Sequence, residues 1–137
     1  SPMRWGTWKP FKLIKTSGQV VVRAVFSPDS TKVISVSQQG TVSVWDLRSH
    51  RVVQSFPLCV PGSGRHDRPV TSVQFSPDGT QIVTAAEDYT AKLWNVATGD
   101  VLRTFVGHHS NVESAAFSPD GMQVVTASMD RTAKLWN

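Results

Sequence analysis

The chain alternates short apolar runs with polar turn signals. In its middle third, runs of six residues at 70–75, 81–86, 90–95 and 101–106 are separated by signals such as SPDG and TG. Apolar runs of this length between Gly, Pro, Asn and Asp are typical of β-strands and too short for most helices. The pattern therefore predicts four short antiparallel strands within a unit of about 42 residues.

This unit occurs three times. FSPD stands at 26–29, 75–78 and 117–120, which gives spacings of 49 and 42 residues, and Trp45, Trp94 and Trp136 have the same two spacings. The units align as VVRAVFSPDSTKVISVSQQGTVSVWD, VTSVQFSPDGTQIVTAAEDYTAKLWN and VESAAFSPDGMQVVTASMDRTAKLWN. Self-similarity at such a period is the signature of a repeat architecture.

The SPDG segment suits a tight turn between the first two strands. Pro fixes φ at the second position, Asp can bond to the backbone that follows it, and Gly accepts a positive φ. The first repeat has Ser30 where the others have Gly79 and Gly121. We therefore expect a less favourable turn in the first repeat.

The dipeptides Trp45-Asp46, Trp94-Asn95, Trp136-Asn137 and Gly107-His108, in this order and spacing, resemble the WD-repeat family. The resemblance covers residues 9–137. It implies an all-β fold of WD-repeat β-propeller blades, namely three four-stranded antiparallel blades forming a partial propeller. We expect an N-terminal extension at 1–8 and blades at about 9–56, 57–106 and 107–137, with 9–16 as the fourth strand of a closing blade.

Two sets of polar residues keep a fixed register with the strand tryptophans. They are His66, Thr84, Asp88 and Trp94 in the second repeat, and His108, Thr126, Asp130 and Trp136 in the third. A His, a hydroxyl and a carboxylate together suggest a nucleophile. The resemblance instead implies a structural hydrogen-bond chain from Trp to hydroxyl to His to Asp, and the donors and acceptors match this chain. We therefore expect no catalytic residue and no enzyme activity.

The first repeat departs from this pattern. Ser35 and Trp45 are in place, but Ser17 stands where the His is expected and Gln39 where the Asp is expected. We expect packing alone to hold this blade, which makes it the softest of the three.

The resemblance also implies where a partner binds. In the family, partners most often contact the rim of the face that carries the network turns. By register, the matching positions are Val20, Val22 and Gln38 in the first repeat, Pro69, Thr71 and Glu87 in the second, and Asn111, Glu113 and Met129 in the third. Each of them could equally be a solvated surface residue. Glu87 and Glu113 together could form an acidic spot for Lys or Arg.

One connection is longer than the other. Seven more residues separate Trp45 from His66 than separate Trp94 from His108, and they fall in PLCVPGSGRHDRP. Insertions in repeat proteins map to loops, and loops often carry function. This loop is therefore a candidate for what distinguishes the protein, with neutral length variation as the alternative.

Charge and composition add a second hypothesis about partners. At 39% hydrophobic and 18% charged, the composition is that of an ordinary globular domain, and no run is long enough to span a membrane. The net charge of +4 arises in the N-terminal segment, where basic residues alternate with Trp5, Trp8 and Phe11. This segment could contact nucleic acid or an acidic partner, or could be a solvated edge strand.

Three blades do not close a ring, because propellers have four or more. The segment PFKLIKT at 10–16 has the register of a fourth strand, and the sequence stops after a third strand at Asn137. We expect either a piece of a longer propeller, whose remaining blades lie elsewhere in that chain, or a homo-oligomer in which copies complete one another.

These observations favour a non-catalytic scaffold or adaptor that binds a protein or peptide partner through its loop-bearing face. The alternative is a nucleic-acid or ribonucleoprotein component that uses the basic N-terminal segment. We expect no cofactor and no metal, since neither a cysteine nor a carboxylate cluster accompanies His108 and His109. The lone Cys59 fits a reducing compartment, so we expect an intracellular, cytoplasmic location.

Overall fold

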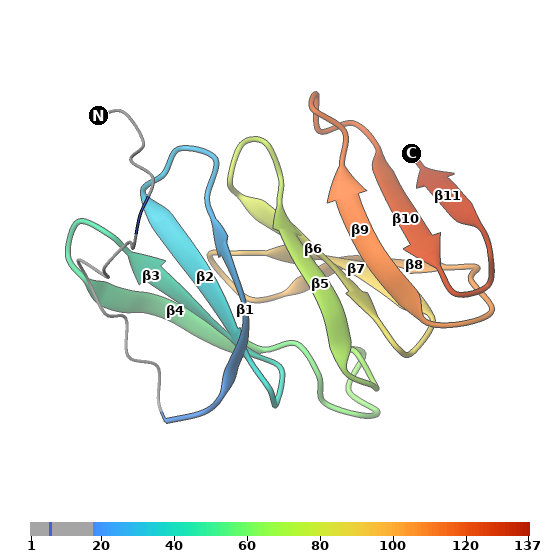
Figure 1. Ribbon diagram of the computed structural model, residues 1–137, viewed down its shortest axis with the longest axis horizontal. Helices are drawn as coiled ribbons and strands as arrows, with labels where there is room; N and C mark the ends of the chain where they lie inside the picture. The colour runs from blue at the N-terminus through green and yellow to red at the C-terminus, as the bar shows by residue number, and fades with distance from the viewer. Residues whose placement is uncertain (1–5, 7–17) are drawn as a thin grey trace.

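The computed structural model describes residues 18–137 and Gly6, and residues 18–137 form three antiparallel sheets that lie in a row (Figure 1). The first sheet consists of β1 Val21–Phe26, β2 Lys32–Ser37, β3 Thr41–Asp46 and β4 Arg51–Pro57. The second consists of β5 Val70–Phe75, β6 Gln81–Ala86, β7 Thr90–Asn95 and β8 Val101–Val106. The third consists of β9 Val112–Phe117, β10 Val124–Ser128 and β11 Ala133–Trp136.

Neighbours in each sheet are consecutive in the sequence, so every sheet is a simple meander. The row of sheets is open and does not close into a ring within the described residues (Figure 1). The predicted all-β, partial-propeller architecture is therefore confirmed. β5 to β8 have the bounds that the apolar runs of the second repeat predict.

The turns between the first and second strands explain where those strands end. In the second sheet, the Asp78 carboxylate accepts hydrogen bonds from the Ser76 hydroxyl at 2.7 Å and the Thr80 amide at 3.0 Å. Gly79 has a φ of 75°, which glycine adopts without steric cost. The equivalent Ser30 has a φ of 61°, a conformation that costs a residue with a Cβ atom about 1 kcal/mol. The first repeat thus has the less favourable turn, as predicted.

Two apolar clusters fill the spaces between the sheets. The first lies between the first and second sheets and contains Ile34, Val44, Phe56, Leu58 and Trp94 among its buried side chains. The second lies between the second and third sheets and includes Val83, Ala91, Phe105, Val112 and Val124. Each sheet therefore has little core of its own and depends on its neighbour for burial, as expected for stacked repeats.

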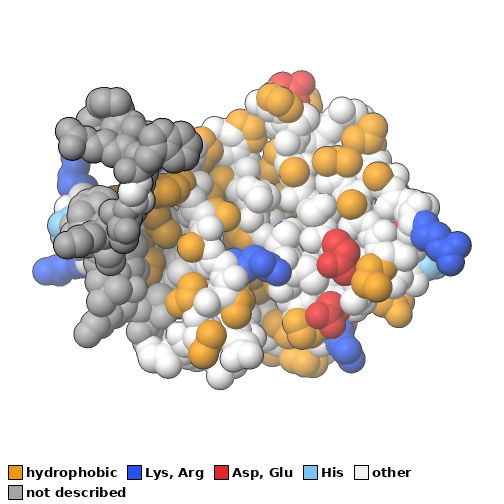
Figure 2. Space-filling model, in the orientation of Figure 1, with side chains coloured by type: hydrophobic (Ala, Val, Ile, Leu, Met, Phe, Trp, Pro, Cys, Tyr) orange, Lys and Arg blue, Asp and Glu red, His pale blue; other side chains and the backbone are white. Residues whose placement is uncertain are grey.

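Among the described residues, no further sheet covers the outer face of the third sheet. Val83 and Leu93 of the second sheet are covered by the third, and Val83 is fully buried. Their equivalents Val125 and Leu135 are 41% and 71% exposed. Figure 2 shows hydrophobic side chains on the surface of this sheet, at the right of the view.

Apart from Gly6, the expected N-terminal extension at 1–8 lies outside the described residues, and so does the expected closing strand at 9–16. In the part of the chain that the structure describes, the third sheet has three strands. Within residues 18–137, we find no helix with the length and apolar character needed to cross a bilayer.

Candidate functional site

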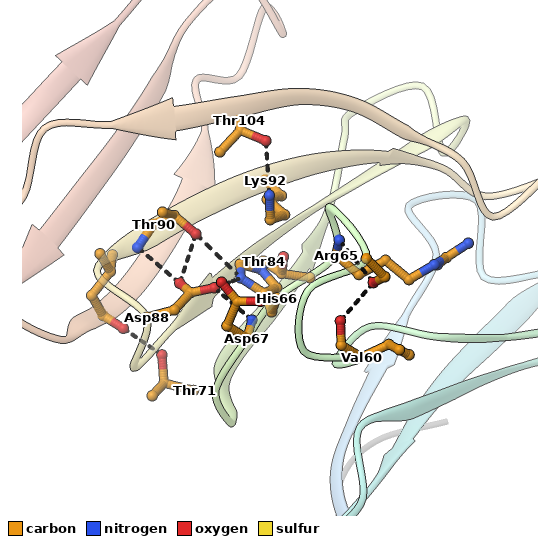
Figure 3. Close-up of polar contacts among 12 residues, drawn as sticks. Val60, Arg65, His66, Asp67, Thr71, Thr84, Asp88, Thr90, Lys92 and Thr104 are labelled. Atoms are coloured by element: carbon orange, nitrogen blue, oxygen red, sulfur yellow. Dashed lines mark hydrogen bonds and ion pairs between the residues drawn. The ribbon is translucent and has the colours of Figure 1, made fainter.

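A hydrogen-bond network joins three elements of the second sheet (Figure 3). Thr84 lies in β6, Trp94 lies in β7, and His66 lies in the loop before β5. The Trp94 Nε1–H group donates to Thr84 Oγ1 at 2.8 Å. His66 Nε2 lies 2.6 Å from Thr84 Oγ1, and His66 Nδ1 lies 2.9 Å from an Asp88 carboxylate oxygen in the turn between β6 and β7.

The order of donors in this network follows from chemistry. An indole N–H can only donate, so Thr84 Oγ1 accepts from Trp94 and gives its own proton to His66 Nε2. The His66 Nδ1–H group then donates to the Asp88 carboxylate. Thr84 and His66 are fully buried, and the Thr84 hydroxyl both accepts one hydrogen bond and donates another. Thr84 is therefore not available as a nucleophile, and the network stabilises the sheet.

The third sheet repeats this geometry with its own four residues. Trp136 Nε1 donates to Thr126 Oγ1 at 2.9 Å, and His108 Nε2 lies 2.6 Å from the same oxygen. His108 Nδ1 lies 2.7 Å from an Asp130 carboxylate oxygen. The structure thus brings together, as two groups of four, the eight residues that the sequence singles out for the networks.

A threonine two positions after each network Asp completes the site, and sequence reasoning missed it. The Thr90 hydroxyl and amide donate to Asp88 Oδ1 at 2.6 Å and 3.0 Å. Burial raises the pKa of Asp88, but hydrogen bonds from His66 and Thr90 outweigh it and hold the pKa well below its usual range. A hydrogen bond from Thr132 is the main cause that lowers the pKa of Asp130. The D-x-T pattern that the two repeats share could have identified these threonines from the sequence.

The first sheet lacks this network within the described residues. Trp45 Nε1 is buried without a hydrogen-bond partner there, although Ser35 is buried in the strand opposite. Gln39 stands at the position of the turn Asp, and Ser17 lies outside the described residues. A buried donor without a partner costs about 1–3 kcal/mol. The interpretation of the first blade as the softest stays a prediction, with this orphaned donor in its favour.

The residue before each network His packs on the strand Trp. In the third repeat this residue is Gly107, where an added Cβ would lie 3.1 Å from the Trp136 ring. In the second repeat it is Arg65, whose guanidinium carbon lies 5.4 Å from the centre of a Trp94 ring. A cation in this position over an indole face is attracted by the ring. The long loop therefore ends by covering the Trp of its own network.

The long loop between β4 and β5 is folded onto the sheet. Leu58 is fully buried in the first core cluster, and its amide donates to the Gly40 carbonyl at 2.7 Å. The Arg65 guanidinium donates to the Pro57 carbonyl at 2.5 Å, and the Gly62 amide donates to the Asp67 carboxylate at 2.9 Å. The ends of the loop therefore have a structural role, whatever its tip contacts.

The rim positions expected to contact a partner are paired through their backbones. The amide of Gln38 donates to the Val20 carbonyl at 2.7 Å, and the amides of Glu87 and Met129 donate to the Pro69 and Asn111 carbonyls at 2.9 Å. These pairs hold the β2–β3, β6–β7 and β10–β11 turns, together with the loops that precede β5 and β9, on one edge of the sheets. We call this the network edge.

A hollow of about 340 Å³ lies at the network edge between the second and third sheets. It is lined by Arg68, Glu87, Asp88, Tyr89 and Asn111. Within the described residues, the side chains of Arg68, Glu87, Tyr89 and Asn111 make no hydrogen bond or ion pair. Sequence reasoning included Glu87 and Asn111 but missed Arg68 and Tyr89, because only the folded chain brings the loop before β5 beside the β6–β7 turn.

The other positions expected to contact a partner do not line this hollow. The Thr71 hydroxyl donates to the Val112 carbonyl at 2.5 Å and so links the second and third sheets (Figure 3). Glu113 is exposed on β9 and is absent from the lining of the hollow, and Met129 is 61% exposed. Val22 is exposed on β1. The acidic spot of Glu87 and Glu113 therefore stays a prediction.

Metal binding has no candidate group among the residues that the structure describes. No three or more His, Cys, Asp or Glu side chains gather there in a way that could hold an ion. Buried Lys92, whose pKa is lowered by burial, donates to the Thr104 hydroxyl at 2.9 Å and is not part of a carboxylate cluster.

Comparison with known proteins agrees with the blade geometry. The family model described as "WD domain, G-beta repeat" matches residues 9–46, 59–95 and 99–137. A search of curated proteins found no match. Two similar solved structures are described as a crystal structure of RRP9 WD40 repeats and a structure of U3-55K. Each has a TM-score of 0.80 and 23% sequence identity, over 92% of this chain and 38% of the other.

At 23% identity these two likenesses concern the fold alone, and the chain spans about two fifths of the length of each structure. The family match includes all three repeats and all residues of both hydrogen-bond networks. WD-repeat domains generally serve as non-catalytic scaffolds for protein interactions. From its three matched repeats and the blades that they form, this chain belongs to the WD-repeat family.

Proposed function

We propose that this chain is a non-catalytic scaffold or adaptor module that binds a protein or peptide partner at its network edge. The observation that carries the proposal is the hollow between the second and third sheets. Four of its side chains have no hydrogen-bond or ion-pair partner within the described residues, namely those of Arg68, Glu87, Tyr89 and Asn111. Polar side chains that converge on a hollow without bonding one another are available to a ligand.

Hydrogen bonds hold the backbone around the hollow in place before a partner binds. Asp88 lines the hollow, but its carboxylate accepts hydrogen bonds from His66, Asp67 and Thr90. The network therefore fixes the turn that presents Glu87 and Tyr89. A site whose backbone is fixed before binding loses less conformational entropy when the partner arrives.

The exposed outer face of the third sheet supports a second part of this proposal. In the complete assembly, further blades cover Val125 and Leu135, and these blades come from a longer chain or from another copy. The basic segment on which the nucleic-acid alternative depends lies outside the described residues. The nucleic-acid alternative therefore stays a prediction.

Binding measurements on point variants test the proposal better than a loop deletion. Removal of residues 57–65 would delete buried Leu58 and the Arg65 contact with Trp94, and would therefore disturb the fold. Tyr89 is suited to substitution, because its φ of 72° favours glycine and the first repeat has Gly40 at this position. Tyr89→Gly removes the ring while it relaxes the backbone.

We expect Glu87→Lys and Tyr89→Gly each to weaken partner binding about tenfold or more, the loss typical of a central contact. Affinity capture with the 137-residue chain supplies the partner, and calorimetry with the purified partner supplies Kd. Gln123→Lys, in the exposed β9–β10 turn at the opposite edge of the third sheet, is the control and is expected to bind normally. Unchanged affinity of both hollow variants, with unfolding midpoints at the wild-type value, would contradict the proposal.

A further inference from the structure

A second hollow lies at the opposite edge of the sheets, between the first and the second. It has a volume of about 410 Å³, and its lining includes Lys32, Val44, Val53, Thr80, Val96 and Ala97. These residues come from β2, β3 and β4 of the first sheet, and from the β5–β6 and β7–β8 turns of the second sheet. We call this hollow the trough. It shares no residue with the hollow at the network edge.

The floor and one wall of the trough are aliphatic. Val44 and Val96 are buried at its base. Val53 is the extra residue of a β-bulge. Val44 pairs with Gln54 and its neighbour Trp45 pairs with Val52, so Val53 has no partner in β3. A bulge redirects a side chain, and Val53 is left 55% exposed beside the trough. The surface is therefore shaped for aliphatic side chains, and no described aromatic residue lines it.

The bond between the Gln54 side-chain amide and the Ala97 carbonyl, at 2.6 Å, crosses from the first sheet to the second. Gln54 also lines the trough, so this bond holds the two walls together. The trough is thus a formed feature of the interface between blades and does not require a rearrangement before a ligand can enter.

One end of the trough is basic. Lys32 is shared with a neighbouring hollow of about 560 Å³, which Arg48 and Asp46 also line. The Asp46 carboxylate accepts a hydrogen bond from the Ser49 amide at 2.8 Å, and this bond lowers the pKa of Asp46. Lys32 Nζ lies 3.9 Å from Asp46, beyond hydrogen-bond distance, and its side chain is 41% exposed. Within the described residues, the Lys32 ammonium therefore has donors free for a second carboxylate.

We propose that the trough is a second docking surface, for an extended acidic peptide segment of a partner protein. An aliphatic side chain of the segment lies on Val44, Val53 and Val96, and a neighbouring Asp or Glu side chain pairs with Lys32. Lys32 and Arg48 lie near two carboxylates, Asp29 and Asp46, but both carboxylates already accept hydrogen bonds from their own turns. The Lys32 ammonium donates no hydrogen bond within the described residues, and these free donors favour an acidic segment over a basic one. A module that docks one partner at each edge can hold two proteins together.

Peptide titrations followed by NMR of the 137-residue chain test this directly. The probes are Ac-Glu-Val-Asp-Leu-Glu-NH2 and two matched peptides, in which Lys replaces all acidic residues or Gln and Asn replace them. We expect the acidic peptide to shift the Val44, Val53 and Val96 methyl resonances and to bind more tightly than the other two. Shifts confined to the network edge, or equal binding of all three peptides, would overturn the proposal and leave the proposed function standing.

The repeats supply matched variants for the same titration. Val53→Glu is expected to weaken binding of the acidic peptide about tenfold, because it replaces aliphatic surface with a negative charge that repels the peptide. Lys32→Gln, which introduces the residue of the second repeat (Gln81), is expected to weaken it about threefold. Leu102→Glu alters the equivalent bulge of β8, outside the trough, and is expected to have no effect. Equal losses in the Val53 and Leu102 variants would overturn the assignment.

Discussion

Replacement of Thr84 by Val is expected to lower the free energy of unfolding by about 3 kcal/mol, because it leaves two buried groups without partners. Valine has nearly the shape of threonine, so no cavity forms. The Trp94 N–H group and His66 Nε2 both lose their bonds to Thr84 Oγ1. Both groups belong to side chains that are fully buried, where water cannot replace the hydroxyl. Urea unfolding followed by tryptophan fluorescence gives the free energy.

Two variants serve as controls for this result. Thr84→Ser retains the hydroxyl and is expected to retain most of the stability. Ser35→Ala, at the matched position of the first sheet, is expected to cost less than about 1 kcal/mol, because Trp45 Nε1 has no bond to lose within the described residues. If Thr84→Val and Ser35→Ala cost the same, the network does not contribute the stability assigned to it.

Replacement of Gly99 by Ala is expected to cost about 2–4 kcal/mol, since two separate effects add. Gly99 has a φ of 75°, which strains a residue with a Cβ atom. The new Cβ would also lie 2.8 Å from Cγ of Phe56, which is buried and stacks on Trp94 at 6.1 Å between ring centres. Phe56 must therefore move within the core between the first and second sheets.

Gly79→Ala separates the two effects. Gly79 has the same φ of 75°, but its added Cβ would lie 3.7 Å from the nearest neighbouring atom, which is ordinary contact. We expect this control to cost about 1 kcal/mol, the backbone strain alone. Thermal unfolding of both variants measures the difference. Equal shifts in melting temperature would show that Phe56 accommodates the methyl group, and would contradict the tight contact between the blades.

The strands were predictable from the sequence because their signals are local. Each SPDG turn and each six-residue run determines its own structure, and the threefold repetition made the pattern recognisable. The membership of the networks was also predictable, because register along the repeats carries it. Thr90 and Thr132 were missed although the D-x-T signal was present, because their bonds to Asp88 and Asp130 lie within a single turn and register along the repeats does not assign them to the networks.

Other features depend on contacts that no single repeat contains. Arg68 and Tyr89 line the same hollow only because the loop before β5 folds beside the β6–β7 turn. The trough needs a β-bulge in the first sheet next to two turns of the second sheet. The close approach of Gly99 to Phe56 likewise crosses between two blades. Such features result from packing between sheets, which hydrophobic periodicity does not specify.

The central claim is that hydrogen-bond networks hold the second and third blades, whereas the described residues of the first blade form none. The most direct measurement compares the melting temperatures of Asp130→Ala and Gln39→Ala, which alter the same turn position in different blades. Asp130 accepts bonds from His108, His109 and Thr132, while Gln39 has no such role within the described residues. The account predicts a clearly larger decrease for Asp130→Ala, and equal decreases would contradict it.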